Sequence, residues 1–100
     1  MKIEFLFWRG CPSHPEAREL LDEVLAARGI QASIEEVEVT TQEEAERLRF
    51  PGSPTIRVDG RDVDPAGAVA RPALTCRIYH LPDGRVWPVP TREQLEEALK

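Results

Sequence analysis

The N-terminal third of the chain has the pattern of a strand followed by an amphipathic helix. Apolar side chains of "KIEFLFW", residues 2–8, fall on both faces of the expected strand, which is typical of a central strand covered by helices on both sides. Residues 13–28 place apolar side chains at helical spacing, and these form one buried stripe: Ala17, Leu20, Leu21, Val24 and Leu25. Ser13 and Glu16 have the spacing of a capping box, and Gly29 is expected to end the helix.

Residues 32–39 predict a second strand. Val37 and Val39 would point to the core, whereas Ile34 is out of phase with them. We therefore expect a bulge or a late start in this strand. Because a helix joins the first two strands, they should be parallel, with a right-handed crossover.

A short helix and a hairpin follow. Either Thr40 or Thr41 has the spacing to cap a helix over 41–49, since a glutamate lies three residues after each. Residues 55–58 predict a strand, and the Asp-Gly pair after it is a hairpin signal, so "RDVD", 61–64, should return antiparallel.

The C-terminal third predicts a second hairpin and a last helix. "TCRIYH" and "RVWPV" flank "LPDG", a turn sequence, after an irregular segment over 65–75. Thr91 and Gln94 open a helix over 91–99. The pattern thus predicts one α/β domain over 1–100 with a four-stranded mixed sheet and an added hairpin. Helices 13–28 and 91–99 would cover one face of the sheet, and helix 41–49 the other.

Composition and charge narrow the class of protein. The chain has 100 residues, enough for a single modest core. Its apolar runs are shorter than the ~20 residues that cross a membrane, and Glu4 interrupts the N-terminal one, so we expect a cytoplasmic protein. The net charge of −5 argues against nucleic acid and against an anionic membrane surface as partners.

Arginines and aspartates gather in the second half of the chain. Four arginines alternate with three aspartates, a pattern typical of surface ion pairs: Arg57, Arg61, Arg71, Arg77, Asp59, Asp62 and Asp64. The two cysteines and two histidines do not have zinc-finger spacing, so no metal site is expected.

Cys11 lies in the expected loop between the first strand, residues 2–8, and the first helix, residues 13–28. Ligands of open α/β sheets bind at this edge, outside the carboxyl ends of parallel strands. A helix N-terminus favours negative charge and therefore a thiolate. The alternative is a small buried cysteine that only fills space, but Cys11 lies in a loop between Gly10 and Pro12, which favours a nucleophile.

The chain resembles the thioredoxin/glutaredoxin superfamily, in particular small bacterial thioredoxin-like proteins. The resemblance rests on "GCPSH" after a hydrophobic strand and on "GSPT" before a later one, and segment 65–90 departs from it. It implies a thioredoxin-like three-layer α/β/α sandwich and thiol–disulfide exchange, with Cys11 as the attacking thiol. It also implies that Pro54 is a cis-proline facing that thiol, so that Pro12, Ser53, Pro54 and Thr55 line the substrate site.

His14 is the main departure from the family pattern. The second cysteine of the family's C-x-x-C motif would stand at this position. The imidazole would either hydrogen-bond to a thiolate one helical turn away or lie exposed in the first turn of the helix. Without that cysteine, the Cys11 mixed disulfide would have to be resolved either by Cys76 or by an external thiol such as glutathione.

Cys76 has two expected positions. If "VDGRDVD", residues 58–64, forms a tight hairpin, the next segment starts near the active-site end of the sheet and Cys76 lies close to Cys11. If "TCRIYH" is itself the returning strand, Cys76 lies at the far end as a buried strand residue. We favour the first position.

Three functions compete at this point. The first is a thiol–disulfide oxidoreductase acting on a protein or small-molecule disulfide, with Cys11, His14 and Cys76 as catalytic candidates and glutathione as a co-substrate rather than a bound cofactor. The second is a carrier of a soft metal or metalloid through Cys11 and Cys76. The third is a redox-inactive interaction domain. The sequence names no substrate and leaves the oligomeric state open.

Overall fold

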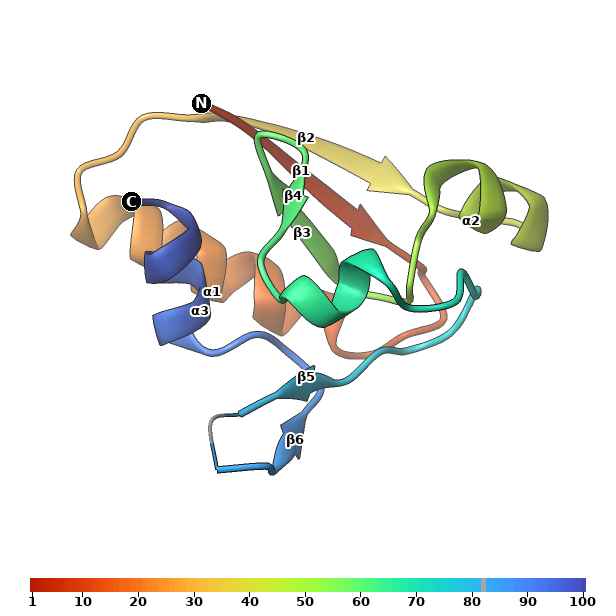
Figure 1. Cartoon of the computed structure of the whole chain (residues 1–100). Coiled ribbons are helices and arrows are strands. Elements are labelled where there is room, and N and C mark those ends of the chain that lie inside the picture. Colours follow the sequence, from red (N-terminus) through yellow and green to blue (C-terminus); the bar gives the residue numbers. More distant parts are fainter. Residues whose placement is uncertain (82) are drawn as a thin grey trace.

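The computed structural model describes residues 1–81 and 83–100, and this part of the chain forms a mixed α/β structure with a four-stranded mixed sheet and three α-helices (Figure 1). The strand order is β2-β1-β3-β4. The strands are β1 Lys2–Phe7, β2 Ser33–Glu38, β3 Thr55–Val58 and β4 Arg61–Asp62. β1 runs parallel to β2 and antiparallel to β3, and β4 returns antiparallel to β3, as expected.

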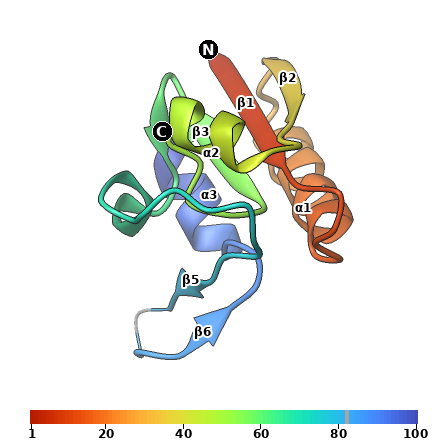
Figure 2. The same ribbon diagram turned by 90° about the vertical axis from the view of Figure 1, so that its right-hand side faces the viewer.

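The helices cover the two faces of the sheet unequally. α1, His14–Ala27, and α3, Arg92–Ala98, lie side by side on one face, as Figure 1 and Figure 2 show. α2, Gln42–Leu48, packs on the opposite face. This arrangement confirms the prediction from the two-faced apolar pattern of the first strand.

Each face of the sheet has its own apolar core. The larger core joins the sheet to α1 and α3 and includes Ile3, Phe5, Leu21, Val24, Ile56, Val58, Leu95 and Leu99. The smaller core joins the sheet to α2 and consists of Leu6, Val39, Ala45 and Phe50. β1 contributes to both, which fixes it at the centre of the fold.

The second strand starts at Ser33, one residue later than expected, and the expected bulge is absent. Pairing of β1 with β2 runs without a break from Lys2–Ser33 to Phe7–Glu38. Ile34 packs on the α1 side and Val37 on the α2 side, because alternate residues of a strand point to opposite faces. The change of phase therefore marks a strand that contributes apolar side chains to both cores.

The helix ends agree with the predictions except at Ser13. Ser13 is the N-cap of α1, but its side chain makes no capping hydrogen bond, so the expected capping box is absent there. Of the two candidates for α2, Thr41 is the cap, and its hydroxyl accepts from the Glu44 amide. Thr91 and Gln94 form the complete capping box of α3.

The second hairpin is shorter than expected and lies outside the main sheet. It consists of β5, Tyr79–His80, and β6, Val86–Trp87, and it projects from the rest of the structure (Figure 2). A short 3₁₀ helix, η1 Pro65–Ala68, occupies part of the segment expected to be irregular. Pro82 of the expected turn lies outside the described residues. Across the described part of the chain, no helix has the length and apolar character to span a membrane.

Candidate active site

Cys11 lies in the loop between β1 and α1 and is buried, with 1% of its surface exposed. Its amide donates a hydrogen bond to the Trp8 carbonyl at 3.0 Å. Its thiol donates to the Ser53 carbonyl oxygen, 3.4 Å away. The thiol therefore points at the loop before β3, not into open solvent.

The loop before β3 contains the Ser53–Pro54 peptide bond, which is cis, as expected. Ser53 is fully buried. Its hydroxyl accepts a hydrogen bond from the Trp8 amide at 3.0 Å. This contact holds the loop against the end of β1, next to Cys11.

The backbone of Ser53 is engaged by the chain itself. The Ser53 amide donates to the Thr75 carbonyl at 2.7 Å, and the Arg77 amide donates to the Ser53 carbonyl at 3.0 Å. These two bonds form an isolated bridge that places Cys76 opposite Ser53. An outside peptide could pair with this backbone edge only after segment 75–77 had left it, which limits the expected substrate role of Ser53, Pro54 and Thr55.

The bridge brings the two cysteines together. Cys76 lies opposite Ser53 in this bridge, and Cys11 Sγ lies 3.4 Å from the Ser53 carbonyl oxygen. Interaction with Cys11 and partial burial raise the pKa of Cys76 to about 11. Cys76 therefore keeps its proton at neutral pH. Cys76 is exposed at the surface, whereas Cys11 is buried. The favoured position of Cys76, close to Cys11, is the one observed.

His14 and Pro12 are not drawn into this cluster. The His14 ring stacks on Phe7, with ring centroids 4.8 Å apart. Within the described residues, His14 makes no hydrogen bond to Cys11. Pro12 follows Cys11 in the loop between β1 and α1, and its side chain is exposed.

A buried polar network lies beside the thiols. It contains Arg77, Asp62 and Asp64, so the expectation of surface ion pairs is wrong for these three residues, whose side chains are buried. Arg77 and Asp62 form an ion pair at 2.8 Å, and each side chain is only 5% exposed. Arg77 also donates to the Thr55 hydroxyl at 3.1 Å, and its guanidinium lies 4.1 Å from the centre of the Tyr79 ring. The Tyr79 hydroxyl donates to the Pro54 carbonyl, and burial raises the pKa of Tyr79.

This network is the part of the site that the sequence did not reveal. One signal was available: Arg77 directly follows Cys76 and is separated from buried Tyr79 by one residue. In an extended segment, residues two apart share a face. Arg77 and Tyr79 therefore had to point the same way, into the core.

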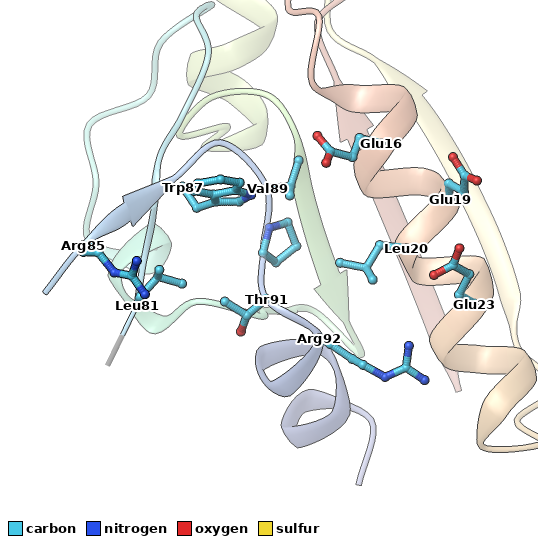
Figure 3. A pocket seen from close by; sticks show the side chains of 11 residues that line it. Glu16, Glu19, Leu20, Glu23, Leu81, Arg85, Trp87, Val89, Thr91 and Arg92 are labelled. Atoms are coloured by element: carbon cyan, nitrogen blue, oxygen red, sulfur yellow. The ribbon is translucent and has the colours of Figure 1, made fainter. Parts of the chain in front are cut away.

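The surface has hollows near to and far from the thiols. A groove of about 640 Å³ lies between α1 and the β5–β6 hairpin, and its lining includes Glu16 and Leu20 of α1 and Trp87 of β6 (Figure 3). It contains none of the residues expected at the site. A smaller hollow of about 400 Å³ has Cys76 in its wall, together with Pro51, Ile78 and His80.

Considering residues 1–81 and 83–100, no group of three or more His, Cys, Asp or Glu side chains is placed to hold a metal ion.

Comparisons of the chain with protein-family models, with curated proteins and with solved structures found no match. The function is therefore inferred from the chemistry of the two thiols and their surroundings.

Proposed function

We propose that the protein is a thiol–disulfide oxidoreductase in which Cys11 is the nucleophilic thiolate and Cys76 is its partner thiol. The observation that carries this proposal is the meeting of both cysteines at Ser53, although they come from distant parts of the sequence: Cys11 Sγ lies 3.4 Å from the Ser53 carbonyl oxygen, and Cys76 is bridged to Ser53 through the backbone. Two cysteines can form a disulfide without backbone movement when their Cα atoms lie within about 7 Å.

The electron balance of the reaction is complete with a disulfide substrate. The dithiol form transfers two electrons and two protons to a disulfide R–S–S–R. It releases two R–SH molecules and becomes the Cys11–Cys76 disulfide. Two external thiols such as glutathione, or one protein dithiol, reverse the change and leave as a disulfide. No metal or organic cofactor takes part in these steps.

A thioredoxin-like fold is part of the same proposal. The order of the elements supports it, because a β-α-β unit with parallel strands is followed by an antiparallel hairpin and a C-terminal helix. The cis Ser53–Pro54 bond beside Cys11 supports it as well. Segment 65–90, which supplies Cys76, is the addition that distinguishes this chain from the pattern.

The direct test is to oxidise the protein in glutathione buffers of defined ratio, quench with acid and alkylate the free thiols. Cleavage after arginine separates the cysteines into peptides 10–18 and 62–77, since Pro72 blocks cleavage after Arg71. We expect these two peptides to be joined by a disulfide that disappears in reducing buffer. If no such joined peptide forms at any glutathione ratio, the two-cysteine mechanism fails.

Single-cysteine variants then separate one-thiol from two-thiol chemistry. Reduction of a chromogenic aromatic disulfide should be lost in Cys11→Ser, because the nucleophile is gone. Cys76→Ser should lose it as well, with or without glutathione, because the exchange passes through both sulfurs; activity retained in glutathione would instead indicate one-thiol chemistry at Cys11. A Cys11→Ser protein as fast as the parent would contradict the role of Cys11.

A soft-metal carrier is the second candidate, because two adjacent thiols are also suitable ligands for a soft cation. Native mass spectrometry after incubation with Cu(I) distinguishes the candidates. One retained ion per chain that is lost in both Cys→Ser variants would favour the carrier.

A further inference from the structure

The two sulfurs differ sharply in access. Cys11 is 1% exposed, whereas Cys76 is exposed. Thiol–disulfide exchange requires the attacking sulfur to reach the sulfur under attack, so access decides which sulfur reacts. In the observed arrangement, a molecule from solvent meets Cys76 and not Cys11.

A hollow leads to Cys76 from outside. Its volume is about 400 Å³, and Cys76, Pro51, Ile78 and His80 line it. Ile78 is 54% exposed, so this wall is open and apolar. Hollows of about 300–1,000 Å³ are typical of sites for small molecules. A low-molecular-weight thiol therefore fits the approach to Cys76, whereas the backbone edge at Ser53 is already paired with the chain itself.

The charge distribution gives the two sulfurs opposite roles in exchange. In the dithiol form the pKa of Cys76 is raised to about 11, so Cys76 keeps its proton at neutral pH and is the poorer leaving group of the two sulfurs. When the disulfide between them is attacked, the sulfur that better holds negative charge leaves more readily. Attack at Cys76, which expels Cys11, is thus favoured by both access and charge.

We infer that low-molecular-weight thiols exchange with this protein at Cys76, and that Cys11 is the inner nucleophile that only makes and breaks the bond to Cys76. This inference rests on the proposed function, because it needs the Cys11–Cys76 disulfide. It reverses the expectation from the sequence that an outside partner meets Cys11.

Each step is balanced. An external thiolate R–S⁻ attacks Cys76 Sγ, forms R–S–S–Cys76 and expels Cys11 as a thiolate. A second R–S⁻ attacks the sulfur of R, leaves as R–S–S–R and expels Cys76, which takes up a proton from water. Two external thiols are oxidised and the protein disulfide is reduced. In the opposite direction, the Cys11 thiolate attacks the mixed disulfide at Cys76 and releases R–S⁻.

The test traps the mixed disulfide in the unaltered protein. The oxidised protein is mixed with reduced glutathione, quenched with acid within the first turnover and cleaved after arginine. We expect glutathione on peptide 62–77 roughly tenfold or more above peptide 10–18. Equal labelling, or labelling mainly on 10–18, would overturn the inference. Failure to form the starting disulfide would instead overturn the proposed function, so the two outcomes are distinct.

A matched pair of variants tests the hollow. Ala70 lines the hollow beside Cys76, whereas the neighbouring Val69, 89% exposed, does not. Ala70→Trp should slow reduction by glutathione about tenfold by restricting access, and Val69→Trp should leave the rate unchanged. Peptide mapping before reduction should find the Cys11–Cys76 disulfide in the same share of molecules in both variants. Equal glutathione rates in the two variants would contradict approach through this hollow.

Discussion

Removal of the charge of Asp62 should destabilise the protein far more than a surface substitution. The Asp62→Asn variant keeps the shape of the side chain but leaves the Arg77 guanidinium buried without its counterion. Both side chains of this pair are 5% exposed. A buried charge that loses its partner costs about 3–5 kcal/mol, a large part of the about 5–15 kcal/mol that holds a domain folded.

The same structure predicts the result of the double variant. Arg77→Met alone should cost a similar amount, because it leaves the Asp62 carboxylate buried and unpaired. Together, Asp62→Asn and Arg77→Met remove both charges, so the double variant should be more stable than either single one. We expect its loss to be at least about 2 kcal/mol smaller than the sum of the two single losses.

Urea unfolding under reducing conditions measures these differences. At an m-value of about 2 kcal/mol/M, a loss of 4 kcal/mol moves the midpoint down by about 2 M. The exposed pair of Arg85 and Asp83 is the control, since Arg85→Met should cost less than about 1 kcal/mol. A cost below 1 kcal/mol for Asp62→Asn, or strict additivity in the double variant, would refute the reasoning.

Three further predictions concern the thiols and the loop that faces them. The pH midpoint for alkylation of Cys76, followed by peptide mapping, should lie near 11. In Cys11→Ser, which removes the neighbouring thiol, this midpoint should move down toward the ordinary ~8.5. An unchanged midpoint would contradict the contact between the two thiols. Because folding raises the pKa of Cys76, its stabilising contribution is complete below about pH 8.5 and is lost as the pH rises through about 11. Unfolding free energies measured at several pH values should show this loss in the parent protein and not in Cys76→Ser. Gly52→Ala should lower stability by about 1–3 kcal/mol, since Gly52 has φ of 130° and an added Cβ would lie 2.7 Å from Arg77 Cβ. The control is Gly60→Ala, with φ of 84° and open space around it, which should cost only about 1 kcal/mol. Equal shifts of the melting temperature in the two variants would contradict the close approach of Gly52 to Arg77.

The apolar pattern predicted the elements well where one side-chain period governed a segment. α1 and β1 carry clear helical and two-faced patterns, and their bounds differ from the predictions by one residue. The pattern misled at β2, because Ile34 and Val37 serve different cores and a simple alternation cannot describe both. The pattern also overestimated the second hairpin, whose strands are short and largely exposed.

The site was predicted only where the local sequence or the family resemblance determines it. The position of Cys11 at the strand–helix junction follows from the local pattern and is observed. The cis Ser53–Pro54 bond is also observed, but it was expected from the resemblance to thioredoxin-like proteins and not from local sequence. Whether Cys76 reaches Cys11 depends on the path of segment 65–75, for which the sequence offered two alternatives. The pairing of Asp62 with Arg77 depends on that same path, so composition alone suggested a surface pair.

Segment 75–77 explains why these features occur together. Thr75 and Arg77 pair with the backbone of Ser53 on either side of Cys76. The Arg77 side chain turns inward to Asp62, while the Cys76 side chain, on the opposite face of the extended segment, meets Cys11. The backbone pairing fixes the position of Cys76 opposite Ser53, and the Arg77–Asp62 ion pair fixes which face of the segment points inward. A rotation of this segment would therefore cost the buried ion pair as well as the thiol contact, so Cys76 should stay beside Cys11 in the dithiol form without a bond between them.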